Sequence, residues 1–228
     1  MKRIEDKTFS DISKGSKYRK QAFSYTAHTG FDTSVNPVPA RIIVEISAFA
    51  NPFPYEKRTI EPFVTTYLKK QKMEDVIEMY HLEPFELKVL SLKQTLCEKI
   101  VSLIRFSMSE QPTASLSSKI RHFYDLNALL NIKELEDYVY RKEFVRDIKT
   151  LVEHDQQAFD EPLGWKDLKD INQSPLVVDF DHLWEILTPK YVENLSAIAY
   201  RDIPSSNTIK ASFMKIMKSL REIDLTNE

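Results

Sequence analysis

The apolar positions of the chain are most regular between residues 91 and 106, where they predict a helix. Apolar side chains recur there at helical spacing, at Leu92, Leu96, Ile100, Leu103 and Ile104. Ser91 suits the N-cap, and Gln94 three residues later would complete a capping box. Lys99 falls at the border of the apolar stripe. It is either a snorkelling side chain with its ammonium in water or a charge held in a cleft, and the pattern alone favours the first.

A second helix is predicted at residues 119–130, with three polar side chains on one arc. Arg121 and Asp125 are four residues apart, and His122 and Asp125 are three apart, so their side chains can meet. One interpretation is a solvated ion pair, worth only about 0.3–0.5 kcal/mol. The other is a carboxylate held in a fixed rotamer near a phosphate or a base. The residues alone favour the first.

The strongest strand pattern is Arg41 to Phe49, which is rich in isoleucine and valine. Alternation places Ile43, Glu45 and Ser47 on one face. A glutamate in the middle of such a strand costs free energy unless it is paired, metal-bound or solvated. An exposed face of an antiparallel sheet explains Glu45 about as well as a functional site does.

The other elements complete an α+β fold. The pattern predicts strands at 18–27 and 85–90, a helical or irregular stretch at 61–80, and helices in most of the chain beyond residue 130. Pro189 is expected to divide two short helices, 180–187 and 191–200, and a last helix is expected to start at Ser205 or Ser206. We therefore expect a small sheet region in residues 1–90 and a mainly α-helical region in residues 91–228.

Composition narrows the function classes. The 228 residues are 42% hydrophobic and 29% charged, with a net charge of −2, so no global basic field points to nucleic acid. The only three glycines are dispersed, and neither a Rossmann fingerprint nor a P-loop occurs. The histidines have no metal-ligand spacing. Cys97, the single cysteine, is interpreted as an apolar filler of its helix. No membrane span or signal peptide is evident, which makes the cytoplasm the expected location.

Several stretches, taken in order, resemble the AbiEii/AbiGii toxin family of nucleotidyltransferase-like proteins from bacterial abortive-infection and toxin–antitoxin systems. The helix Ser91–Phe106 carries Glu98-Lys99-Ile100, and it is followed by Arg121-His-Phe-Tyr-Asp-Leu126. Upstream, Val38-Pro-Ala-Arg-Ile-Ile-Val-Glu-Ile-Ser47 is similar to the family strand that carries an acidic residue. The resemblance covers about residues 17 to 130.

This resemblance implies a partial nucleotidyltransferase-like sheet and transfer of a nucleoside monophosphate from a nucleoside triphosphate (NTP) to an acceptor such as tRNA. Such enzymes hold Mg²⁺ with carboxylates and balance the triphosphate charge with a cation. By resemblance, Glu45 is the third acidic residue beside the metal-binding pair, Lys99 contacts the triphosphate, and Asp125 is the essential aspartate, supported by Arg121 and His122. The implied role is phage defence, with a cognate antitoxin as a partner.

Two family motifs are missing from the sequence. The family's first motif is a Gly-Gly-Ser/Thr turn, and its second is an Asp-x-Asp pair on the following strand; this chain has neither. A lone Glu45 does not hold two magnesium ions. We therefore expect a truncated gene, an expressed fragment or a lineage that lost catalysis, with weak activity in this chain. The alternatives are a non-catalytic family remnant that binds a protein partner, and a helical RNA-binding protein.

Overall fold

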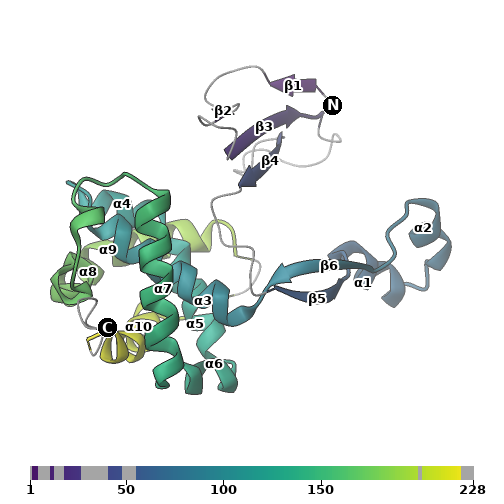
Figure 1. Ribbon diagram of the computed structural model, residues 1–228. Coiled ribbons are helices and arrows are strands. Elements are labelled where there is room, and N and C mark those ends of the chain that lie inside the picture. Colours follow the sequence, from purple (N-terminus) through teal and green to yellow (C-terminus); the bar gives the residue numbers. More distant parts are fainter. Residues whose placement is uncertain are drawn as a thin grey trace. The chain divides into compact units, whose positions relative to one another are not determined.

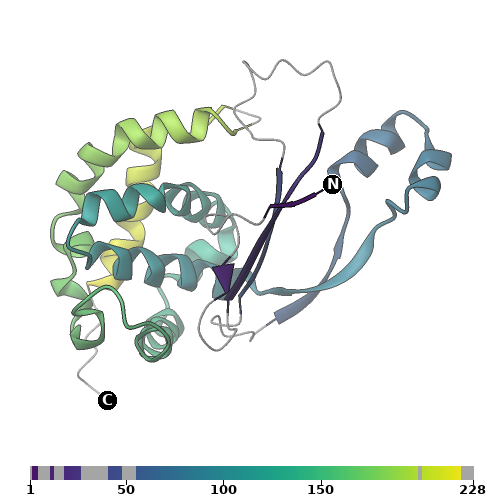
Figure 2. The same ribbon diagram turned by 90° about the horizontal axis from the view of Figure 1, so that it is seen from above.

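The structure, a computed structural model, describes residues 2–4, 11–12, 18–26, 41–47, 55–199 and 202–221. All described strands precede residue 91, where they form antiparallel pairs, and most of the helices follow it (Figures 1 and 2), so the expected α+β class is confirmed. The contacts divide the chain into two compact units. The first is Met1–Asn51 with Val192–Ile203, and the second is Pro52–Tyr191 with Pro204–Glu228. The boundary at residue 90 stays a prediction from the sequence.

The first unit contains a four-stranded antiparallel sheet built around β3. Its strands are β1 (Lys2–Ile4), β2 (Asp11–Ile12), β3 (Tyr18–Ser24) and β4 (Arg41–Ser47). β4 pairs with the whole of β3, from Tyr18 opposite Ser47 to Ser24 opposite Arg41. β1 and β2 pair with residues of β3 that also face β4, so they share its other edge. The two predicted strands of this region are confirmed, while residues 27, 48 and 49 lie outside the described residues.

The second unit begins with an arm, residues 55–90 (Figure 1). Its strands β5 (Tyr55–Ile60) and β6 (Phe85–Leu90) form an antiparallel pair, and α1 (Phe63–Lys70) and α2 (Glu74–Met79) lie between them in sequence. The arm has a small core of its own, with Leu68 and Ile77 buried. The sequence predicted β6 but not β5, because the charged run at 56–58 gives β5 little apolar alternation.

The rest of the second unit is helical. Its elements are α3 (Leu92–Ser107), α4 (Pro112–Ser118), α5 (Ile120–Leu130), α6 (Lys133–Tyr138), α7 (Lys142–Ala158), η2 (Trp165–Asp167), η3 (Ile171–Gln173), α8 (Pro175–Val178), α9 (Phe180–Ser196, of which the last five residues are assigned to the first unit) and α10 (Ser206–Leu220). The predicted helices that became α3, α5 and α10 are confirmed. α4 was not predicted, since its serine-rich sequence has little apolar periodicity.

The predicted break at Pro189 is wrong, because α9 is one continuous helix with Pro189 inside it. A proline there removes one backbone hydrogen bond and crowds the preceding turn. Packing on both sides outweighs that cost, since Trp184, Leu187 and Tyr191 are all buried. The Tyr191 hydroxyl also donates a 2.7 Å hydrogen bond to the carbonyl of Pro204.

An aromatic cluster joins α5, α9 and α10 at the centre of the helical core. The ring centroid of Phe123 lies 5.0 Å from that of Phe213 and 5.2 Å from that of Trp184, and those of Phe180 and Phe213 are 4.6 Å apart. Offset and edge-on pairs of this kind stabilise beyond the area they bury. The expected inner face of α10 is confirmed, with Ile209, Phe213, Ile216, Met217 and Leu220 all buried. None of the helices in the described part has the length and hydropathy of a bilayer span.

Candidate functional site

The candidate site lies where α3 and α5 present polar side chains to each other. The side chain of Ser91 caps α3 by accepting a 3.1 Å hydrogen bond from the backbone N–H of Gln94, as the sequence predicted. The predicted capping box is only half formed among the described residues, because the Gln94 side-chain amide donates to Glu98 at 3.0 Å and not back toward Ser91. α5 packs against α3 through its apolar face, on which Phe123 and Leu126 are buried. The phases of the two helices are therefore fixed by their apolar residues.

This packing brings Lys99 and Asp125 together. Lys99 Nζ donates to Asp125 Oδ2 at 2.6 Å, within the range of a charge-assisted hydrogen bond. The two side chains are 22% and 38% exposed, so the pair is reachable by a ligand. Lys99 is therefore paired with a carboxylate, and its predicted role as a charge held in a ligand-binding cleft stays a prediction.

His122 borders this pair and is held in its neutral form. Its Nδ1 lies 4.0 Å from Asp125 Oδ2, and this nitrogen is buried without a hydrogen-bond partner among the described residues. Burial, followed by the charges of Lys99 and Lys119, lowers the pKa of His122 to about 4. The cations around His122 outweigh the nearby carboxylate, so the local potential is positive although the whole chain is slightly acidic.

Arg121 stands apart from the pair. It is exposed, and within the described residues no ion pair joins it to Asp125. The carboxylate pairs with Lys99 of the neighbouring helix in place of the arginine one turn away. Arg121 still contributes positive charge, since its guanidinium is one of the groups that lower the pKa of His122. Its assignment as a nucleotide-binding residue stays a prediction.

Glu45 is paired in the sheet of the first unit. It faces Lys20 across β3 and β4, with 3.5 Å between Lys20 Nζ and Glu45 Oε1, and its side chain is 52% exposed. The family roles of Glu45, Lys99 and Asp125 require these three residues to share one site. Because Glu45 belongs to the first unit and Lys99 and Asp125 to the second, that shared site stays a prediction. The pairing of Glu45 with Lys20 is also that of an ordinary charge pair on an exposed sheet face.

The described residues contain no carboxylate cluster that could hold a metal ion by protein ligands alone. Among them, no group of three or more histidine, cysteine, aspartate or glutamate side chains is placed to hold a metal ion. An Asp-x-Asp sequence does occur, at Asp179-Phe180-Asp181, but it leads into helix α9 and not along a strand. Asp181 pairs with Lys210 at 2.7 Å. Glu45 beside Lys20 supplies one carboxylate next to a cation, which is a poor donor set for Mg²⁺.

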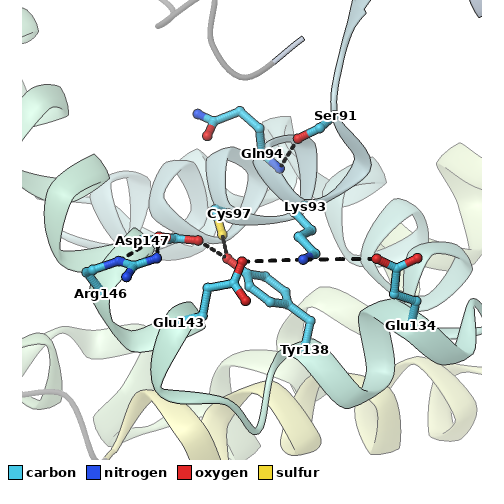
Figure 3. A network of polar contacts seen from close by, with 9 residues as sticks. All are labelled: Ser91, Lys93, Gln94, Cys97, Glu134, Tyr138, Glu143, Arg146 and Asp147. Atoms are coloured by element: carbon cyan, nitrogen blue, oxygen red, sulfur yellow. Dashed lines mark hydrogen bonds and ion pairs between the residues drawn. The ribbon is translucent and has the colours of Figure 1, made fainter. Parts of the chain in front are cut away.

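A second polar network, not anticipated from the sequence, links α3, α6 and α7 (Figure 3). The Tyr138 hydroxyl donates to Asp147 at 2.8 Å and lies 3.4 Å from the sulfur of Cys97. Burial raises the pKa of the Cys97 thiol to about 12, so this cysteine is the inert filler that was predicted. Burial also raises the pKa of Tyr138, which keeps its hydroxyl neutral. The network ties three helices together without offering a reactive group.

The helical unit also has an open pocket of about 770 Å³ near the end of α3. Residues of α3, α4 and the loop at 160–163 line it, and its charged lining groups are Glu110, Asp160 and Glu161. Neither Lys99 nor Asp125 lines this pocket. An acidic rim repels a triphosphate, so the pocket is no candidate for the nucleotide.

A family model described as nucleotidyl transferase AbiEii toxin, type IV toxin–antitoxin system, matches residues 2–209. Since the match spans most of the 228 residues, the protein belongs to a class of nucleotidyltransferase-like toxins. Its family is the AbiEii family, as the resemblance in the sequence implied. Comparisons with curated proteins and with solved structures gave no match.

Proposed function

We propose that Lys99 and Asp125 form the triphosphate-handling part of a nucleotidyltransferase toxin, with an NTP as donor and tRNA as acceptor. The observation that carries this proposal is the 2.6 Å contact between Lys99 and Asp125 across α3 and α5. Half-exposed Lys119 and exposed Arg121 add positive charge near His122, which borders the pair, and a triphosphate requires such cations for charge balance. Family membership supports a nucleotide as the ligand.

The two residues would divide the work of the reaction. In nucleotidyl transfer an acceptor oxygen attacks the α-phosphorus, the bond to the bridging oxygen of the β-phosphate breaks, and pyrophosphate leaves. Lys99 would neutralise the charge that grows on the leaving pyrophosphate. Asp125 would hold the Lys99 ammonium in place, or accept the proton of the acceptor hydroxyl. His122, neutral at physiological pH, adds no charge of its own.

We further propose that this chain transfers nucleotides slowly. A cation can bind a triphosphate, but in-line attack also needs the carboxylate-held metal ions of the family, for which the described residues supply no complete donor set. Incubation with radiolabelled NTPs, magnesium and bulk tRNA should label little RNA. Strong magnesium-dependent labelling that Glu45→Ala abolishes would contradict this and show that Glu45 belongs to a working metal site.

Nucleotide binding tests the Lys99 assignment independently of turnover. We expect Lys99→Ala to weaken NTP binding about tenfold or more, because a hydrogen bond to a charged group is worth about 1.5–3 kcal/mol. Asp125→Asn should not weaken binding, since the asparagine oxygen can still accept the Lys99 hydrogen bond while a negative charge beside the triphosphate is removed. Lys93→Ala is the matched control, because Lys93 lies on the same helix but pairs with Glu143 at 3.3 Å. Equal affinities of the Lys99→Ala and Lys93→Ala variants, measured by calorimetry, would remove the assignment.

The alternative function is a non-catalytic protein-interaction module. It is favoured by the pairing of Glu45 with Lys20, which leaves no carboxylate cluster among the described residues. The family suggests a cognate antitoxin as the partner. If the wild-type chain binds no NTP but forms a complex with the antitoxin, the interaction module replaces the nucleotidyltransferase as the better assignment.

A further inference from the structure

The arm exposes an apolar surface along one face of β6. The register places Ile60 opposite Phe85, so that Phe85, Leu87 and Val89 of β6 share a face with Ile60. Phe85 is 51% exposed and Leu87 is 50% exposed. Glu86 and Lys88 project from the opposite face, where the Glu86 side chain is 71% exposed. β6 therefore has one apolar and one charged face, and both are open to solvent.

The edge of β6 is also open to a further strand. Among the described residues, β6 pairs only with β5, and the extensive contacts between elements do not join the arm to the helices from α3 onward. A two-stranded ribbon is marginally stable in water by itself, and three or more strands with an apolar face are needed for independent stability. An uncovered edge is a template for pairing with another chain.

The sequence of β6 is complementary to itself in an antiparallel register. If two copies pair about a two-fold axis through Leu87, Glu86 of each copy lies opposite Lys88 of the other. Phe85 then lies opposite Val89, and Leu87 opposite its own copy, so both apolar faces merge. Opposite charges and apolar pairs at directly facing positions each stabilise an antiparallel pair.

Two further features single out β6 and this register. On β5 the equivalent pairing, about Lys57, would place two copies of that lysine directly opposite each other, which is destabilising. Within the arm, Lys88 faces Lys57 across the two strands, which places two positive charges opposite each other. The Glu86 carboxylate, 4.0 Å from Lys57 Nζ, partly compensates this repulsion. A second Glu86, from another copy, would add a carboxylate beside Lys88 and offset this like-charge pair.

We propose that the protein forms a homodimer through antiparallel pairing of β6 with β6 of a second copy. The product is a four-stranded sheet with the order β5, β6, β6, β5. On one face the two central strands present only apolar residues, flanked by Glu56, Arg58 and Ile60 of each β5, and on the other face Glu86 and Lys88 alternate across the axis. A single pair of short strands buries less than a standard interface, so the dimer is weak and concentration-dependent. The proposal does not depend on the nucleotidyltransferase assignment, since neither Lys99 nor Asp125 takes part.

Charge reversal tests the register by analytical ultracentrifugation of the full chain. Lys88→Glu places Glu86 opposite a glutamate at both symmetric positions and should raise the dimer dissociation constant about tenfold or more. The same change sets a carboxylate opposite Lys57 within the arm, so a loss of dimer cannot come from a weakened arm. Lys57→Glu, on the same face but on β5, is the matched control and should leave the dimer intact.

Two combinations sharpen the result. The double variant E86K/K88E restores opposite charges across the two-fold axis and should dimerise like the wild type. Glu86→Lys and Lys88→Glu should each be monomeric alone but should form a heterodimer when mixed, because every facing pair is then opposite in charge. A wild type that stays monomeric at all concentrations, or a dimer that Lys88→Glu leaves unchanged, would overturn the proposal and leave the arm to a different partner.

Disulfide cross-linking tests whether the two-fold axis of the proposed dimer passes through Leu87. Leu87→Cys places two thiols opposite each other, within the Cα separation that a disulfide spans, so mild oxidation should link two chains. Arg58→Cys is the control, because Arg58 faces Leu87 on the same side of the arm but lies one strand further from the axis. The native Cys97 is buried and does not compete. Equal cross-linking of both variants would contradict the register.

Discussion

At the scale of single residues, the region between α3 and α5 is governed by one carboxylate among several cations. Asp125 satisfies Lys99 directly, while Lys119 and Arg121 add positive charge nearby. His122 responds to this environment, because its protonation would add a further cation to a partly buried site. The same electrostatics that would attract a triphosphate thus disfavour a charged imidazole.

His122 should therefore give the protein a pH-dependent stability. Its pKa is about 4 in the folded chain and near 6.5 when unfolded, so between these values the unfolded chain binds more protons. The free energy of unfolding should rise with pH across this window, and this contribution is lost as the pH falls from about 6.5 toward 4. Urea titrations at several pH values should show a smaller slope for His122→Gln than for the wild type. Equal slopes would mean that His122 titrates alike in both states.

Parts of this site could be predicted from residue spacing, and parts could not. The helical phase of Lys99 placed it at the edge of an apolar stripe, which is where the structure has it. That Asp125 would pair with Lys99 and not with Arg121 depends on how closely α3 and α5 approach, which local spacing does not contain. The Tyr138 network could not be predicted for the same reason, since Cys97, Tyr138 and Asp147 belong to three different helices.

At the scale of elements, amphipathic periodicity was a sound guide wherever one face of a helix is buried. α3, α5 and α10 each have a regular apolar stripe and were predicted. β5 and the continuous α9 were not, because the charges of β5 point to solvent on an isolated ribbon, and because the packing of α9 outweighs the local effect of Pro189. β5 forms by pairing with β6 and α9 by packing of its buried side chains, and neither interaction is contained in the local pattern of the sequence.

The cap of α3 is the element-scale feature whose contribution is easiest to measure. Ser91 is nearly buried at the junction of β6 and α3, and its hydroxyl oxygen satisfies the Gln94 N–H. We expect Ser91→Ala to lower the free energy of unfolding by about 1 kcal/mol. Ser102→Ala, in the interior of the same helix, should not lower it, because alanine is the better helix former. Equal effects in urea unfolding would show that the cap is not what stabilises the start of α3.

At the scale of the whole molecule, the buried apolar side chains are unevenly distributed. Among the first 51 residues, only Ala22 is buried of those whose side chains the structure describes, whereas α3 alone buries Leu96, Ile100, Leu103 and Ile104. The apolar residues of β4 are between 40% and 61% exposed. Strand alternation predicted β4. It could not predict that apolar side chains on both faces of β4 stay exposed among the described residues. The position of Glu45 relative to Lys99 belongs to this scale too, which is why local patterns leave it open.

This distribution predicts that the two units differ in stability. Apolar burial is the main favourable term in folding, so a sheet with little of it opens at low free energy, while a helical core built around the Phe123 cluster opens only in global unfolding. Hydrogen–deuterium exchange followed by mass spectrometry should show fast exchange in peptides from β3 and β4 and the slowest exchange in peptides from α3 and α5. The arm gives a separate test of the dimer. If a second copy covers β6, amide exchange in β6 should slow as the protein concentration rises, while exchange in β4 stays fast. Equal protection of β4 and α3 would contradict the prediction, since it would require the sheet to gain its stability from contacts beyond those that its described residues make.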